Sequence, residues 1–287
     1  MAGPAVTVRP VDADDVGTVS RFLHEHLNPR VTAENWAKLL LPPWPTVGPN
    51  RGFLLQSGSA LVGVYAAVYS EREINQQTVK ICNLAAFCVL DDYRMHALRL
   101  LRALLGQRGY EFTDLSPSGN VVALNERLGF ERLPVDTKLL FNLPRFHPNV
   151  RVSAAPQLLA RTLRGADARI YRDHRQAPAA RHLLIVRDGD HAYLMFRRER
   201  RRRLPLFATP LYVGGDLDLL AAAWPNVGAY LLWRHGLPFT LAEPRVLGFE
   251  PRPGRRLKGP RPRMFRSRSL RAEDVDYLYS ELTLVSW

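Results

Sequence analysis

The stretch FCVLDDYRMHALRLLRALL, residues 87–105, has the pattern of a short apolar strand, an acidic turn with one arginine, and an apolar helix. The apolar spacing predicts a helix over 93–105 that ends at Gly106 and Gly109. A strand that ends at a helix N-terminus presents unpaired N–H groups and the positive end of the helix dipole, which together favour an anion. Arg94 adds a positive charge suited to phosphate. The stretch therefore predicts either a phosphate site or a plain strand-to-helix connection.

Strands and helices are mixed on both sides of this stretch. Upstream, the patterns predict a strand at 6–9, two helices, and three strands within 52–90. Downstream, they predict a strand at 110–116, a short helix at 121–130 and two extended segments within 131–146. This order is typical of an α/β layer structure with a mixed, mostly antiparallel sheet flanked by helices.

The second half repeats the order of the first. The segments GYEFTDLSP at 109–117 and GLPFTLAEP at 236–244 share Gly, Phe, Thr and Pro in register. Two predicted strands around a glycine turn recur as LLIVRDGDHAYLMFRRERRR, and the apolar helix recurs after VGGDLDLL. We therefore predict two tandem α/β domains, 1–146 and 147–287.

The composition is that of a folded protein, since 46% of the 287 residues are hydrophobic and 23% are charged. The formal net charge of +13 comes almost wholly from arginine and would attract polyanions such as nucleic acid, acidic lipid or phosphorylated cofactors. The sharpest run, RRERRRR at 197–203, lies between two apolar segments and is predicted to be a solvated hairpin turn. Charge alone permits nucleic-acid binding without favouring it.

Two cysteines, Cys82 and Cys88, lie six residues apart on one predicted strand. Their even spacing places both on the same face and roughly 20 Å apart, too far for a disulfide. They have no metal-ligand spacing and are predicted to be small buried hydrophobes in a reducing compartment. The N-terminus has no apolar signal core, and no uncharged apolar run reaches about 18 residues. We therefore expect a cytoplasmic protein without a membrane or metal partner.

The segment VLDDYRMHALRLLRALL, followed after one strand by NVVALNERLGFERL, resembles the GCN5-related N-acetyltransferases. That family has a V-x-P-x-Y-R-G-x-G-x-G/A segment and, downstream, an N-x-x-A-x-x-x-Y-x-x-x-G-F type of segment. The matching positions are Val89, Tyr93, Arg94, Asn120, Ala123, Gly129 and Phe130. The resemblance covers residues 5–142 and implies an N-acyltransferase that uses acetyl-CoA, or another acyl-CoA, as cosubstrate.

The resemblance also implies a cofactor site. The backbone from Arg94 to Arg99 would cradle the pyrophosphate, Val89 and Leu90 would pair with the pantetheine arm, and Asn120 would contact the cofactor. The implied cofactor-binding residues are Val89, Leu90, Arg94, Met95, His96, Ala97, Leu98, Arg99 and Asn120. Met95, Ala97 and Arg99 depart from the glycine or small residues of the family segment. In the second half, VGGDLDLL has no arginine and carries two aspartates, so that half is expected to be structural or to bind the acceptor.

Acyl transfer to an amine needs a base for the ammonium and an acid for the departing thiolate. Ala85 and Ala86 stand near the family's usual carboxylate position, and Asn125 near its tyrosine, and none of these can move a proton. The predicted catalytic residues are therefore Glu71, Tyr93 and Ser116, with Tyr69, Glu73 and Asp114 beside them. Asp276, Tyr277, Tyr279 and Glu281 of the C-terminal segment could reach a cleft between the halves.

Three functions remain open on the sequence. The leading one is an N-acetyltransferase acting on a small-molecule or peptide amine. The second resembles the aminoacyl-tRNA-dependent peptidyltransferases of cell-wall synthesis, which would suit the arginine surplus but not the matching Arg94 and Asn120 segments. The third is a protein that binds CoA or another ligand without turnover. The sequence leaves the acceptor, the acyl group and the oligomeric state open.

Overall fold

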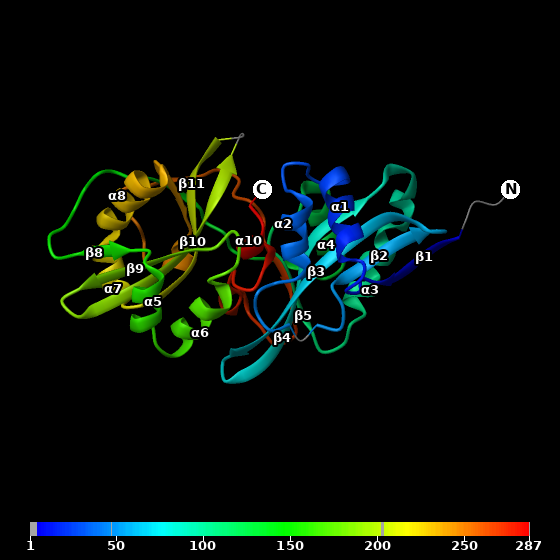
Figure 1. The fold of residues 1–287 in the computed structure, drawn as a ribbon, viewed down its shortest axis with the longest axis horizontal. Helices are drawn as coiled ribbons and strands as arrows, with labels where there is room; N and C mark the ends of the chain where they lie inside the picture. The colour runs from blue at the N-terminus through cyan, green and yellow to red at the C-terminus, as the bar shows by residue number, and fades with distance from the viewer. Residues whose placement is uncertain (1–4, 47, 202–203, 287) are drawn as a thin grey trace.

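The computed structural model of the chain describes residues 5–46, 48–201 and 204–286. Within these residues, two seven-stranded mixed sheets are each flanked by helices, and the C-terminal segment, red in Figure 1, runs between them. This arrangement confirms the predicted α/β class with two tandem domains of similar architecture. No described helix has the length and apolar character needed to cross a membrane.

The first sheet has the strand order β1-β2-β3-β4-β5-β14-β6. Its strands are β1 (Val6–Pro10), β2 (Gly52–Ser57), β3 (Ala60–Ile74), β4 (Gln77–Val89), β5 (Glu111–Asp114), β14 (Met264–Arg266) and β6 (Glu131–Arg132). The helices α1 (Val16–His26) and α2 (Ala33–Leu40) pack on one face, with Val64 and Ala66 of β3. The helices α3 (Ala97–Leu105) and α4 (Gly119–Arg127) pack on the other, with Tyr65 and Ala67.

The second sheet has the strand order β13-β7-β12-β11-β10-β9-β8. Its strands are β8 (Arg151–Ser153), β9 (Arg181–Arg187), β10 (Asp190–Arg201), β11 (Leu204–Gly215), β12 (Phe239–Ala242), β7 (Lys138–Phe141) and β13 (Arg255–Arg256). Its helices are α5 (Pro156–Thr162), α6 (Gly165–His174), α7 (Leu217–Ala222), α8 (Trp224–His235) and α9 (Pro244–Leu247). The repeated segments 109–117 and 236–244 contain β5 and β12, which each pair in parallel with the preceding long strand. The sequence repeat thus corresponds to a structural repeat.

The two sheets exchange strands across the expected boundary between residues 146 and 147. The strand β7 precedes this boundary, yet it pairs with β12 and β13 of the second sheet. The strand β14 follows the boundary, yet it lies between β5 and β6 of the first sheet. Neither sheet is therefore completed by one half of the chain alone.

The helix predicted over 93–105 begins later than expected. Residues Asp91–His96 form a 3-10 helix, η1, in which the N–H of Tyr93 donates to the carbonyl of Leu90 at 2.9 Å. The α-helix α3 then spans Ala97–Leu105 and ends at Gly106, as predicted. The turn is therefore tighter than a direct strand-to-helix connection.

A β-bulge in β4 overturns the prediction that the two cysteines share a face. Ala66 pairs with Ala86, and Ala67 pairs with Leu84, so Ala85 is skipped in the β3–β4 ladder. An extra residue of this kind reverses the alternation of side chains beyond it. Cys82 accordingly packs on the α3 face and Cys88 on the α1 face, and both are buried free thiols.

The exchanged strand gives a test of how the halves are coupled. Phe265 of β14 is 4% exposed and packs against Leu133 of the first half and Leu211 of the second. Phe265→Ala should lower the free energy of unfolding by about 3–5 kcal/mol, because it opens a cavity between the halves. Urea unfolding followed by far-ultraviolet circular dichroism measures the change.

The control is Phe146→Ala, because Phe146 is 67% exposed and its loss should change the free energy by at most about 0.5 kcal/mol. Equal effects of the two substitutions would contradict a shared core around β14.

Candidate active site

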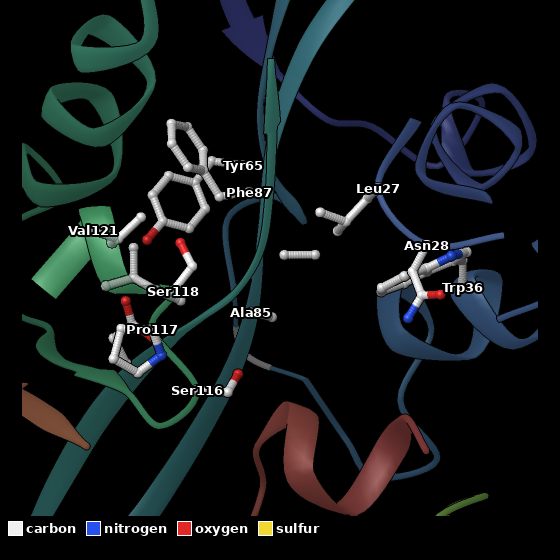
Figure 2. A pocket seen from close by; sticks show the side chains of 13 residues that line it. Leu27, Asn28, Trp36, Tyr65, Ala85, Phe87, Ser116, Pro117, Ser118 and Val121 are labelled. Carbon is white, nitrogen blue, oxygen red and sulfur yellow. The ribbon is translucent and has the colours of Figure 1, made fainter. Parts of the chain in front are cut away.

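A cavity opens in the first half where two parallel strands part. The pairing of β4 with β5 ends at Asn83 and Thr113, and a cavity of about 220 Å³ adjoins this point. Figure 2 shows Tyr65, Phe87 and Val121 on one side of the strand that crosses it, and Leu27 and Trp36 on the other. The remaining lining residues are Asn28, Leu84, Ala85, Ala86, Asp114, Ser116, Pro117 and Ser118. The cavity therefore connects the α1–α2 face of the sheet with the α3–α4 face.

The bulge of β4 forms part of the cavity wall. Ala85 and Ala86 lie at the bulge, and their methyl side chains occupy little of the space beside the backbone. Bulges are common beside active sites because they leave backbone outside the regular ladder. This segment of β4 can therefore accommodate an extended ligand between the parted strands.

Asp114, the last residue of β5, is the one ionisable carboxyl group in the cavity lining. It is 4% exposed, and burial, reinforced by the nearby charge of Glu281, raises its pKa to about 7. The side-chain amide of Asn125 donates to its Oδ2 at 2.8 Å, and the Tyr65 hydroxyl also hydrogen-bonds it. A carboxyl group that titrates near neutral pH can both accept and release a proton.

A second carboxyl group reaches this region from the C-terminal helix α10 (Glu281–Leu284). The Ser116 hydroxyl donates to Oε1 of Glu281 at 2.6 Å, and the backbone N–H of Glu281 donates to Oδ1 of Asn83 at 3.1 Å. Glu281 is fully buried, and this burial raises its pKa. Its Oε2 has no hydrogen-bond partner among the described residues. The second half thus places a buried carboxyl group directly behind Ser116 of the cavity wall.

Buried charges between the halves hold the segment after β5 in place. Arg263 donates to the carbonyl of Leu115 at 2.6 Å and forms an ion pair with Glu243 at 3.4 Å. The Tyr277 hydroxyl donates to the other oxygen of Glu243, and the Arg263 guanidinium lies 4.2 Å from the centre of the Tyr277 ring. Because Leu115 lies between Asp114 and Ser116, these contacts fix the backbone that carries both cavity residues.

The basic run at 197–203 differs from the predicted solvated turn. Its residues up to Arg201 belong to β10, whereas 202 and 203 lie outside the described residues. Arg197 is 2% exposed, donates to the carbonyl of Leu282 at 3.1 Å, and has its pKa lowered to about 10 by burial. Glu199 is also buried and accepts from the Thr209 hydroxyl at 2.8 Å. Part of the run therefore belongs to the contact between the halves.

The predicted cofactor residues lie together at the end of β4 and the start of α3. The N–H of Leu90 donates to the carbonyl of Val62 at 3.0 Å, and Arg99 donates to the carbonyl of Val6 at 2.8 Å. The Arg94 side chain is 74% exposed and pairs with the exposed Asp91 at 2.8 Å. Val89, Met95, His96, Ala97 and Leu98 complete this segment. Asn120 lies in α4, and its side chain is outside the described part of the chain. Of these residues, none whose side chain the structure describes lines the cavity.

The structure brings one of the three predicted catalytic residues to the cavity. Ser116 lines it. Glu71 is exposed on β3, where it pairs with Lys80 of β4. Lys80 precedes the cavity residue Ala85 by five positions, a distance of roughly 16 Å along the strand. Tyr93 lies half-buried in η1 and packs on the α3 face.

The carboxyl groups at the cavity belong to Asp114 and Glu281. From the sequence, Asp114 is expected beside the predicted catalytic residues, and Glu281 in a segment that could reach a cleft between the halves. An acidic residue at the end of an apolar strand was the available signal for Asp114. Glu281 had no local signal, because 198 residues separate it from Asn83, to which it bonds.

At the equivalent strand of the second half, the described residues line a smaller cavity of about 20 Å³, in which Glu199 and Glu243 lie among three arginines. By the sequence repeat, Leu241 takes the place of Asp114 and Glu243 takes the place of Ser116. Asp216 accepts from the N–H of Leu219 at 2.9 Å and thereby caps the start of α7. That carboxylate occupies the helix end where the first half has η1. Among the described residues, no three metal-ligating side chains gather as a metal ion would require.

No known protein family and no curated protein matches the sequence of this chain. Among solved structures, a GCN5-related N-acetyltransferase from Anabaena variabilis is similar, with a TM-score of 0.60, 12% identity, and coverage of 91% of this chain and 72% of that one. A putative acetyltransferase from Pyrococcus horikoshii has a TM-score of 0.54, 13% identity, and coverage of 100% and 98%.

A GCN5-related N-acetyltransferase from Kribbella flavida has a TM-score of 0.53 at 14% identity, with coverage of 91% and 70%. At such low identity these likenesses concern the fold. The chain therefore has the fold of the GCN5-related N-acetyltransferases.

Proposed function

We propose that this protein is an acyl-CoA-dependent N-acyltransferase that moves an acetyl group from acetyl-CoA to an amine. The observation that carries the proposal is the buried carboxyl group of Asp114, which titrates near neutral pH in the cavity between β4 and β5. This group supplies the proton acceptor that the alanines of β4 cannot provide. The fold supports acyl transfer as the general reaction class.

The residues around the cavity fit an acyl-CoA. Among the described residues, the Arg94 guanidinium forms one ion pair, with the exposed Asp91, so it can turn to a diphosphate at little cost. The α3 N-terminus adds the positive end of a helix dipole, and Val89 ends the strand that borders the cavity. Small side chains at Ala85 and Ala86 leave room beside the bulge. Bound acyl-CoA would supply an activated thioester.

The chain's own residues would then handle the proton of the acceptor. An amine enters as its ammonium form, and Asp114 in its ionised form attracts this charge and accepts one proton. Asn125 and Tyr65 hold the carboxyl group in position through their hydrogen bonds. The largely apolar lining limits water around the reacting groups, which strengthens the interaction between Asp114 and the ammonium.

Binding of acetyl-CoA tests the cofactor part of the proposal. Isothermal titration with the native chain should give micromolar affinity, and Arg94→Ala should weaken it about 10-fold or more, because it removes a charge-assisted contact to phosphate. The matched control is Arg172→Ala in α6, an exposed arginine also paired with an aspartate, which should leave the affinity unchanged. Equal affinity of the native and Arg94→Ala chains for acetyl-CoA would contradict a diphosphate site at this turn.

The pH dependence of turnover tests the role of Asp114. Because burial raises the pKa of Asp114 to about 7, the base form is scarce at pH 5 and prevails above pH 8. The rate of CoA release under saturating acetyl-CoA and amine should therefore rise with pH through about pH 7 and level off above about pH 8. A rate that is flat from pH 5 to 8 would exclude Asp114 as the base.

Substitution of the same residue isolates the proton transfer from binding. Asp114→Asn should lower kcat about 100-fold or more, within the usual range for a lost general base, while acetyl-CoA affinity stays within a factor of about three. Asp218→Asn, at an exposed carboxylate in the second half, should retain the native rate. Native turnover in Asp114→Asn would contradict the proposal.

A further inference from the structure

The cavity of the first half presents a carboxyl group to an acceptor, and no cationic side chain among its described lining residues. Among the described residues that line it, Asp114 is the one with a carboxyl group, and none is a lysine or arginine. Glu281 lies directly behind Ser116 and adds a second buried carboxyl group. The other lining side chains are apolar or neutral, including Asn28 and Ser118.

Two buried arginines, Arg197 and Arg263, line a separate cavity of about 20 Å³ that shares Ser116 with this one, and neither lines the larger cavity. Arg263 donates to the carbonyl of Leu115 and pairs with Glu243. Arg197 donates to the carbonyl of Leu282 on the side of the second half. Arg72 pairs with Asp276. An anionic group that enters the cavity would therefore meet the carboxyl group of Asp114, and no cation among the described lining residues.

The position of an anionic group within the acceptor decides whether it must enter. In an α-amino acid, the carboxylate is on the carbon that bears the amine, so it has to accompany the nitrogen to Asp114. Burying such a charge without a partner, beside a like charge, is strongly unfavourable. In a lysine side chain, the amine is separated from the carboxylate by a chain of methylene groups, and the carboxylate can stay in water.

We infer that the acceptor is a primary amine with no carboxylate or phosphate next to the amine. Arylalkylamines, diamines and the side-chain amine of lysine belong to this class. Free α-amino acids, acting through their α-amine, and phosphorylated amines do not. The inference rests on the proposed function, because it concerns the acceptor of the same cavity.

Matched acceptors test the inference through the rate of CoA release. The set is phenethylamine with phenylalaninamide and phenylalanine, and cadaverine with lysine. The amine and the amide should each have a kcat/KM about 100-fold above that of phenylalanine, an order of magnitude expected from an unpaired charge in a partly buried site. Mass spectrometry of the lysine product should show the acetyl group on the side-chain amine.

The amide separates charge from bulk, because it has nearly the size of the carboxylate and no charge. A kcat/KM for phenylalaninamide as low as that for phenylalanine, or one for phenylalanine as high as that for phenethylamine, would overturn the inference. In either case the observed turnover would still agree with the proposed function. Acetyl-CoA binding without turnover of any acceptor in the set would instead overturn the proposed function, and the inference would fail with it.

A cation placed in the cavity wall should reverse the discrimination. Ser118 lines the cavity and makes no capping hydrogen bond through its side chain at the start of α4, so its replacement removes little stability. Ser118→Arg should reduce the ratio of kcat/KM for phenethylamine and phenylalanine at least about 10-fold. Ser59→Arg, which adds the same charge in the exposed turn between β2 and β3, should leave the ratio unchanged. An unchanged ratio in Ser118→Arg would count against charge as the cause.

Discussion

The pairing of β14 with β5 is the constraint on which the rest of the first half depends. The strand β5 pairs with β4 over only three residue pairs before the two part, so its other edge must be held by another strand. That strand comes from the second half, as residues Met264–Arg266. The strand β7 of the first half pairs in the second sheet, so each half contributes a strand to the sheet of the other. The opening between β4 and β5 is thus stabilised by a segment about 150 residues away from β5.

Buried polar contacts fix the position of one half relative to the other. Apolar packing alone would tolerate small slides of one half against the other, whereas ion pairs and hydrogen bonds require particular atoms to meet. Arg263 holds the carbonyl of Leu115, and the Glu281 carboxyl group holds Ser116. Such groups are costly to bury without partners, so the native arrangement of the halves is strongly preferred over shifted ones. Burial, reinforced by the nearby charge of Glu281, raises the pKa of Asp114.

The division of labour between the halves follows from one difference in their repeated segment. Both halves have a strand that pairs in parallel and then a proline, but the first carries Asp114 where the second carries Leu241. In the first half the parted strands leave a cavity with a titratable group. In the second half, Glu243 turns to Arg263 and Tyr277 and becomes part of the contact between the halves. One copy of the fold thus contains the cavity with Asp114, and the other contributes the contacts that hold the cavity wall.

The sequence by itself determined the α/β class, the duplication and the order of elements, because hydrophobic periodicity and turn residues act over short stretches. It could not reveal the bulge at Ala85, which moved Cys88 to the opposite face, since no residue type there requires a bulge. Nor could it show that Asp114 is buried and Glu71 exposed, because burial depends on what packs against a strand end. The exchange of β7 and β14 and the arrival of Glu281 behind Ser116 were decided only in the tertiary structure. These are contacts between residues far apart in the chain, and their free energy arises only when both halves are folded.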